Sequence, residues 1–457
     1  MEPHATSLWE TTAGARQRRP ALPNDIAVDV AIVGGGYTGL WTAHALKTTD
    51  PALRVALVEA EHVGFGASGR NGGWVSGKLS GLDMLLADPR GRSSAVRLQR
   101  EMIDTVSRIG DVIYDEGIEC GWAHGGTIVA ATRPPHVDRL KETIELRHAV
   151  GFGEEDYRWL DATEARARLG TSRSYGASYT PHCAAVDPLR LARGLADTIE
   201  RLGVDIYEGT AARRIAPGMV RTDHGDVRAE IVVRATEAYT ARFPELRREM
   251  VPVYSLMIST APLDDATWSQ IGLQRRETFS DGRKQVIYGQ RTDDGRLAFG
   301  GRGAPYHYGS RIRPSYDSEP AVFRSLQETL GDLFPILEGV EIDHRWGGPL
   351  AVTRDWLPTV TFDRDTKIGW AGGYAGQGVA TANLAGRIMS DLILGRDTDI
   401  TSLPIVGHRS RRWEPEPLRW LGINVGLAMS KHVDRSEDRT GEAARRRSAV
   451  MKRLIGL

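Results

Sequence analysis

The sequence predicts an α/β protein in which a parallel sheet, assembled from separate parts of the chain, is interrupted by a domain on a mainly antiparallel sheet. Two observations predict this class. Between Val30 and Glu59, an apolar run, a glycine-rich turn, a helical segment and a second apolar run follow one another, which is the order of a strand–helix–strand unit. Later β-rich segments carry hairpin signals at Asp281-Gly282 and Asp294-Gly295, as expected of antiparallel strands.

The composition is that of an ordinary globular protein. The 457 residues are 41% hydrophobic and 26% charged, and 59 basic side chains balance 59 acidic ones, so charge gives no reason to expect a nucleic-acid partner. The N-terminus lacks a signal-peptide core and no run of about 18 apolar residues occurs, so we expect a cytoplasmic protein. Cys120 and Cys183 have no metal-ligand spacing; we expect two core residues and no metal.

The most informative segment is VAIVGGGYTGL, in which Gly34, Gly36 and Gly39 form a GxGxxG pattern directly after an apolar run. Glycine is needed at the first position for a tight turn, at the second for close approach of backbone N–H groups to a pyrophosphate, and at the third for packing of the helix on the strand. Glu59 closes the next apolar run and can accept hydrogen bonds from a ribose diol. The segment therefore predicts a dinucleotide-binding unit.

A second GxGxxG pattern, from Gly64 to Gly69, follows no new strand. We interpret it as part of a glycine-rich loop over residues 64–77, GFGASGRNGGWVSG, which keeps side chains away and offers backbone donors.

Two further blocks return the chain to the parallel sheet. Asp187-Pro188 predicts the start of a helix and Gly203 its end, and the strand-like segments VDIYEG and VRAEIVVRAT follow. Residues 367–378 predict a short strand and a glycine-rich turn, and residues 379–394 a helix. If the ligand is FAD, this second helix N-terminus faces the pyrimidine end of the flavin, where N–H groups stabilise negative charge.

These motifs resemble a known family. The segments VAIVGGGYTGL, VALVEAEHVGFGASGRNGGW, AAVDPLRLARGLA, VVRATEAYT and WAGGYAGQGVATANLAGRIMSDLI are similar to those of FAD-dependent amine and amino-acid oxidoreductases of the D-amino-acid oxidase superfamily. The gamma-glutamylputrescine oxidase and sarcosine/glycine oxidase branch is the most similar. The resemblance covers residues 5–408.

The resemblance implies a discontinuous, Rossmann-like FAD-binding domain with an inserted α+β substrate domain on a mainly antiparallel sheet. We expect residues 1–25 to form an arm on the surface and residues 409–457 a helical tail. The expected FAD-binding segments are 26–118, 172–248 and 346–408, and the expected substrate segments are 119–171 and 249–345.

The resemblance also implies the cofactor site. Relatives that tether the flavin use His or Cys, and the GASGRNGG loop has neither, so we infer non-covalent FAD. The residues expected to bind it are Gly34, Gly36, Tyr37, Thr38, Gly39, Glu59, Ala60, Gly66, Ser68, Arg70, Asn71, Gly72, Gly73, Trp74, Thr236, Gly376, Gln377, Gly378 and Val379.

Substrate-binding residues are expected in the antiparallel sheet. Arg302, Tyr254 and Trp346 are the candidate catalytic residues; the Arg302 guanidinium suits a carboxylate. The strand Leu297 to Gly301 has no Lys, which some oxidases of the superfamily use for the reaction with oxygen. His182 is interpreted as a structural residue. Further pocket candidates are Trp74, Met257, Tyr306, His307 and Tyr374.

The expected activity is oxidation of a C–N bond of a small amine or amino acid by hydride transfer to flavin N5, with oxygen or another electron acceptor. The resulting imine is hydrolysed to a carbonyl product. A flavin-dependent hydroxylase and a non-catalytic flavin-binding redox or assembly protein are the alternatives. The basic segment 445–455 is interpreted as a solvated helix, with contact to a membrane surface as the alternative. The sequence leaves the oligomeric state open.

Overall fold

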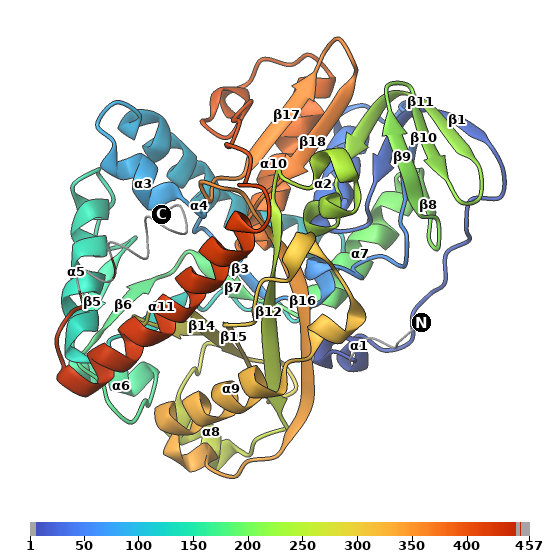
Figure 1. Ribbon diagram of the computed structural model, residues 1–457. Coiled ribbons are helices and arrows are strands. Elements are labelled where there is room, and N and C mark those ends of the chain that lie inside the picture. Colours follow the sequence, from blue (N-terminus) through green and yellow to red (C-terminus); the bar gives the residue numbers. More distant parts are fainter. Residues whose placement is uncertain (1–5, 445–447, 449–457) are drawn as a thin grey trace.

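The computed structural model describes residues 6–444 and residue 448, which form two eight-stranded sheets with helices around them (Figure 1). The first sheet has the order β17-β18-β11-β1-β2-β8, with β9 and β10 attached to β11. Its strands are β1 (Ile26–Val33), β2 (Val55–Val58), β8 (Val204–Tyr207), β9 (Ala212–Ala216), β10 (Met219–Thr222), β11 (Asp226–Arg234), β17 (Thr359–Asp363) and β18 (Ile368–Gly372).

Parallel pairing joins three distant parts of the chain in this first sheet. β1 pairs with β2 on one side and with β11 on the other, and β11 pairs with β18. β8 adds to the free side of β2, also in parallel. The expected return of the chain to a parallel sheet is confirmed, and the carboxyl ends of β1, β11 and β18 lie at one edge.

The second sheet is mainly antiparallel, as expected. Its order is β16-β12-β15-β14-β13-β4-β6-β5, and only the β13–β4 pair among these described strands is parallel. Its strands are β4 (Thr127–Ala130), β5 (Arg158–Leu160), β6 (Ala177–Thr180), β12 (Val251–Thr260), β13 (Thr278–Asp281), β14 (Ile287–Arg291), β15 (Leu297–Arg302) and β16 (Ile342–Val352). A short pair, β3 (Trp74–Ser76) and β7 (Cys183–Ala185), stands apart from both sheets.

Helices cover both sheets. α2 (Tyr37–Thr49) and α10 (Gly378–Ile393) make the most extensive helix contact of the first domain, and α9 (Pro320–Leu333) packs on one face of the second sheet. The other α-helices are α1 (Leu8–Thr12), α3 (Leu82–Ala87), α4 (Arg92–Asp115), α5 (Pro134–His148), α6 (Ala162–Arg168), α7 (Pro188–Arg201), α8 (Asp265–Ile271) and α11 (Leu418–Thr440). No helix within the described residues is long and apolar enough to span a bilayer.

The sheets divide the chain slightly differently from the expected domain boundaries. β6 follows residue 172 and pairs with β4 and β5, so it belongs to the antiparallel sheet. β16 runs through residue 346 and pairs with β12 over its whole length. Strand pairing, which composition does not reveal, carries these segments past the expected boundaries.

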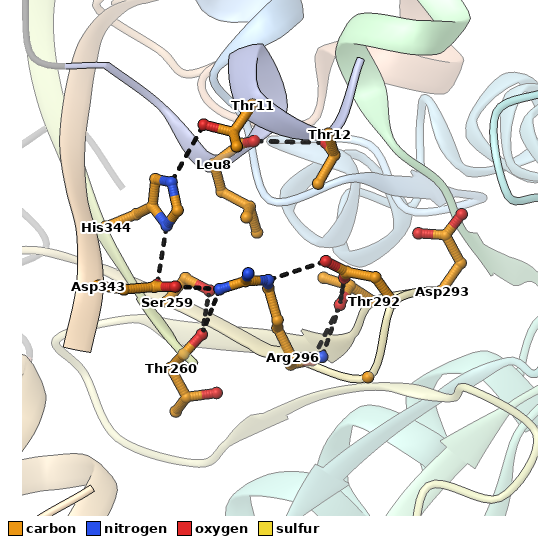
Figure 2. Close-up of polar contacts among 12 residues, drawn as sticks. Leu8, Thr11, Thr12, Ser259, Thr260, Thr292, Asp293, Arg296, Asp343 and His344 are labelled. Carbon is orange, nitrogen blue, oxygen red and sulfur yellow. Dashed lines mark hydrogen bonds and ion pairs between the residues drawn. The ribbon is translucent and has the colours of Figure 1, made fainter. Parts of the chain in front are cut away.

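The N-terminal arm does not simply lie on the surface, and that expectation is wrong for α1. Leu8 and Trp9 are buried against Met257 and Trp346 of the second sheet. Thr11 contacts His344, which is bonded in turn to Asp343, the ion-pair partner of Arg296 (Figure 2). Two large apolar side chains in consecutive positions draw the arm into the core.

α11 provides the helical part of the C-terminal tail and crosses the antiparallel domain (red in Figure 1). The Asp434 carboxylate accepts hydrogen bonds from the Lys284 and Gln285 N–H groups, both at 2.7 Å. Asn424 exchanges two hydrogen bonds with the backbone of Tyr306. The expected basic helix at 445–455 lies outside the described residues, apart from residue 448.

The close contact of α10 with α2 predicts an unusual response to alanine. A Cβ on Gly386 would lie 2.7 Å from the Trp41 carbonyl carbon and 2.8 Å from the Thr42 nitrogen. Gly386→Ala gains about 1 kcal/mol of helix propensity, but the overpacking costs about 1–3 kcal/mol, so the melting temperature should fall. Gly422→Ala in α11, with no atom within 4 Å of the added Cβ, is the matched control and should raise it. An unchanged melting temperature for Gly386→Ala would show that the helices separate without cost.

Candidate active site

The turn between β1 and α2 has the geometry that its glycines predict. Gly34 has a φ of +116°, and a Cβ there would lie 2.4 Å from the Ala235 oxygen. A Cβ on Gly39 would lie 2.1 Å from the Gly34 oxygen. The N-cap of α2 is Gly36, which has no side chain to cap the N–H groups of the first turn. The first turn of α2 therefore offers N–H groups in a place where only backbone fits, as binding of a pyrophosphate requires.

Glu59 lies directly after β2 and faces this turn. Its carboxylate accepts hydrogen bonds from the Gly35 N–H at 2.7 Å and the Glu61 N–H at 2.9 Å. Burial raises the pKa of the Glu59 carboxyl, which these two bonds partly offset. The side chain is half-buried, as is the next residue, Ala60. This arrangement fits a carboxylate that receives the hydroxyls of a ribose.

Side chains of the loop itself and of α1 hold the glycine-rich loop that follows β2. Ser68, in the short helix η1 (Ala67–Gly69), accepts a hydrogen bond from the Tyr37 N–H at 2.9 Å. Asn71 donates to two carbonyls of η1 and accepts from the Gly73 N–H at 2.7 Å. The Trp9 indole donates to the Asn71 oxygen at 2.8 Å, so α1 helps to fix the loop.

Arg70 joins this loop to the antiparallel domain. Its guanidinium donates to Asp317 at 2.8 Å and lies over the Phe65 ring at 4.5 Å. Both charged side chains are buried. The Trp346 indole donates to the Arg70 oxygen at 2.9 Å. Protein groups thus engage both the guanidinium and the backbone carbonyl of Arg70.

The end of the loop lies against β14. Gln290 donates to the Gly72 oxygen at 2.7 Å, and a Cβ on Gly72 would lie 2.7 Å from the Tyr288 ring. Trp74 packs edge-on against Tyr288, with the ring centroids 6.2 Å apart. The buried Trp74 indole N–H has no hydrogen-bond partner among the described residues, which marks a polar atom available to a ligand.

The glycine-rich turn at residues 372–378 lies next to the turn between β1 and α2. α10 begins at Gly378 with Gln377 as an N-cap that makes no side-chain bond, so the N–H groups of its first turn, Val379 included, lack a capping side chain. The Tyr374 hydroxyl is bonded to Thr38 Oγ1 of α2 at 2.9 Å, and both side chains are buried. The two helix N-termini predicted from the sequence are therefore joined by a direct contact.

Arg302 ends β15 beside this turn. Its guanidinium donates to the Ala375 oxygen at 2.6 Å and lies 5.1 Å above the centre of the Trp356 ring. Burial lowers the pKa of Arg302. A Cβ on Gly376, whose φ is +93°, would lie 3.1 Å from this guanidinium, so the glycine leaves room for it.

The three candidate catalytic residues do not share one face of the antiparallel sheet. Arg302 pairs with Ser255 in the register of β15 and β12, and directly opposed residues point to the same face. Trp346 is on this face too but is fully buried and bonded to Arg70. Tyr254 points to the opposite face, where it packs edge-on against His307 and Tyr316.

The remaining candidates divide between the site and the core. Met257 packs with Trp9 and Trp346, and Tyr306 with α11 through Asn424. His182 is paired with Asp156 at 2.7 Å, in line with a structural role. Burial raises the pKa of both cysteine thiols to about 12. Within the described residues, no cluster of three His, Cys, Asp or Glu side chains is placed to hold a metal.

Four polar residues near the site were not found from the sequence. Tyr288, whose hydroxyl is 2.8 Å from Ser255 Oγ, shares the face of Arg302. Gln290 holds the glycine-rich loop, and Glu237 holds the turn at residues 372–378. Tyr288 and Gln290 lie two positions apart in a strand, so alternation along β14 could have identified them as a same-face pair. No local signal marks Glu237.

A cavity lies elsewhere in the molecule. It has a volume of about 670 Å³ and is bounded by the N-terminal arm, the end of α4 and α7. Arg16, Arg19 and Arg201, which line it, are ion-paired with neighbouring carboxylates. It contains none of the glycine turns and is separate from the site described above.

The fold and the site define a flavoprotein with a dinucleotide-binding domain. Its backbone cradle at Gly34 to Gly39, the half-buried Glu59 and the unpartnered Trp74 N–H fit the pyrophosphate, ribose and ring system of FAD. A family model for FAD dependent oxidoreductases matches residues 29–392. The chain belongs to this family, and FAD is its cofactor.

Relatives and solved structures agree. The Gamma-glutamylputrescine oxidoreductase of Escherichia coli (strain K12) is 32% identical over 403 residues, which cover 86% of this chain and 90% of that protein. The Probable oxidoreductase OrdL of Rhizobium meliloti is 29% identical, covering 87% and 90%. The crystal structure of glycine oxidase from Geobacillus kaustophilus superposes with a TM-score of 0.69 at 23% identity, covering 84% of this chain and 99% of that one. This last likeness supports the fold.

Replacing Glu59 tests the ribose contact. Glu59→Gln keeps the size of the side chain but removes the charge-assisted bonds, which are worth about 1.5–3 kcal/mol. The affinity for FAD should fall about tenfold to a hundredfold, measured by fluorescence titration of the FAD-free protein. An unchanged dissociation constant would exclude Glu59 as the ribose ligand.

Proposed function

We propose that this protein oxidises a C–N bond of a small amine or amino acid with non-covalently bound FAD. The observation that carries the proposal is the position of Arg302, a half-buried residue whose guanidinium adjoins the turn leading into α10. A cationic side chain at this place suits a substrate that bears a carboxylate. The names of the relatives, a gamma-glutamylputrescine oxidoreductase and a glycine oxidase, agree with an amine substrate.

FAD, when bound, supplies an acceptor for a hydride from the carbon next to the amine nitrogen. The chain's own residues bind and orient the substrate so that this carbon is held at reacting distance. Arg302 binds a carboxylate by paired N–H donors, and the Ser255 and Tyr288 hydroxyls, on the same face of the sheet, bind further polar atoms. These are the residues we assign to substrate binding.

The amine must lose a proton before hydride transfer, because its lone pair forms the imine as the hydride leaves. Burial among apolar side chains lowers the pKa of an amine, and Trp74 and Met257 are apolar side chains on this side of the sheet. No dedicated base is then required. Water hydrolyses the imine to a carbonyl compound and a smaller amine.

Reoxidation uses oxygen or another acceptor. β15 carries no lysine from Leu297 to Gly301, and Arg302 is the cationic residue at its end. Its charge suits the stabilisation of a developing anion in either half of the reaction. Comparing reoxidation by air with reoxidation by a dye or quinone decides which acceptor serves.

Anaerobic bleaching of the flavin absorbance tests the activity. An amine panel that includes gamma-glutamylputrescine, glycine and N-methyl amino acids should contain a compound that bleaches the flavin. Bleaching by NAD(P)H alone would identify a hydroxylase, and no bleaching by any amine would favour a binding protein.

Acid precipitation tests the non-covalent binding. The loop GASGRNGG has no His or Cys, so the yellow colour should pass into the supernatant. Colour that stays in the pellet would mean a covalent flavin.

Substitution of Arg302 tests the carboxylate contact. Arg302→Met should lower kcat/KM for amino-acid substrates about tenfold to a hundredfold more than for amines without a carboxylate, since a bond to a charged group is worth about 1.5–3 kcal/mol. Rapid-reaction measurement of anaerobic flavin reduction gives both values. Equal losses for the two classes would assign Arg302 to holding the Ala375 turn alone.

A further inference from the structure

Glu237 occupies a place that the proposed chemistry does not use. It opens the short helix η2 (Glu237–Arg242), directly after Thr236, with a left-handed φ of 41°. A non-glycine residue is strained at a positive φ. Its side chain leaves the first sheet and reaches segments that lie 114 and 137 positions further along the chain.

The Glu237 carboxylate accepts hydrogen bonds from backbone N–H groups only. The Ala351 N–H of β16 donates at 3.0 Å and the Tyr374 N–H at 3.1 Å, each to a different oxygen. The Gly373 N–H contributes a further bond. No charged group of the described residues balances the carboxylate. A carboxylate accepts several donors at once, whereas an amide or a protonated carboxyl presents a donor of its own to one of them.

Glu237 and Arg302 bind neighbouring residues of one segment, Tyr374 and Ala375. Ala351 also accepts a hydrogen bond from the Ala375 N–H at 3.0 Å, and the Ala375 oxygen accepts from Arg302 at 2.6 Å. Residues 373–375 are thus fixed by an anion from the FAD domain and a cation from the substrate domain. Gly376 follows directly and leads into the N-terminus of α10.

We propose that Glu237 is a positioning residue, which as a carboxylate fixes residues 373–376, and with them the N-terminus of α10, relative to Arg302. This inference rests on the proposed function, because it deepens the account of how the flavin turn meets the substrate group. The neutral acid loses at least one of the three backbone bonds, so the turn has a looser arrangement when Glu237 is protonated.

Burial supports a change of state at neutral pH. It raises the pKa of the Glu237 carboxyl to about 7, against the lowering effect of the three backbone donors. The elements around it carry other charged or titratable groups. The charge of Glu237 helps to raise the pKa of Tyr374. The other charged groups on these elements have partners of their own: Arg302 with Ala375, Arg354 with Glu414, Asp355 with His408, Arg234 with Glu249, and Arg242 with the ring of Tyr239.

Hydrogen exchange and circular dichroism of the FAD-loaded protein test the proposal. In Glu237→Gln, the peptide that contains Gly373 to Gly376 should exchange about tenfold faster, because its hydrogen bonds to a charged acceptor are lost or weakened. The flavin-band circular dichroism of the wild type should change across neutral pH with a midpoint near the pKa of Glu237, and Glu237→Gln should lack this change.

Two variants complete the design. Glu245→Gln, an exposed carboxylate in the same segment, should keep the wild-type exchange and the pH transition. Glu237→Asp keeps the charge but shortens the reach, so it should keep a transition while exchanging faster. Should Glu237→Gln lose FAD, exchange of its FAD-free form is compared with that of the FAD-free wild type, where the same acceleration is expected.

Wild-type exchange and an unchanged pH transition in Glu237→Gln would overturn the proposal. Neither measurement uses a substrate. If no amine bleaches the wild-type flavin while the transition follows Glu237, the proposed function fails and the positioning role stands.

Discussion

The parallel register of β1, β11 and β18 is the constraint on which the site depends. These strands come from positions more than a hundred residues apart, yet they end at one edge of the sheet. Each is followed there by a piece of the site: the Gly34 turn, the Glu237 segment and the turn into α10. Ligands bind at the carboxyl ends of parallel strands because the connecting segments diverge there. Strand pairing, rather than any single side chain, brings the two helix N-termini together.

A buried ion pair and a half-buried arginine join the two domains around this edge. Arg70 meets Asp317, and Arg302 meets the Ala375 carbonyl. Removal of one partner from a buried ion pair costs about 3–5 kcal/mol because an uncompensated charge remains. Loss of Arg70 or Asp317 alone is therefore expected to weaken the contact between the glycine-rich loop and the antiparallel sheet.

The sequence predicted the parts of the site whose chemistry is local. Gly34, Gly36, Gly39 and Glu59 were found because the turn, the helix start and the acid lie within one strand–helix–strand unit, and the start of α10 was placed within one residue. Tyr254 was predicted and Tyr288 was not. Both faces of the antiparallel sheet are buried, so the alternation of apolar residues does not indicate which face meets the first domain. Glu237 was missed since its partners are backbone groups, which leave no trace in residue type. Trp9 was assigned to a surface arm because its neighbours are polar.

The two indoles that bond to the glycine-rich loop, those of Trp9 and Trp346, are synthesised at very different times. One indole reaches it from a helix at the start of the chain and the other from a strand that is 276 positions later than Arg70. During synthesis on the ribosome the loop emerges early, but the second tryptophan is made only when three-quarters of the protein has been translated. Until then the loop lacks the indole donor of Trp346. The cofactor site is thus completed late in translation. A fragment that ends before residue 346 contains the predicted phosphate-binding turn but lacks the strand that supports the neighbouring loop.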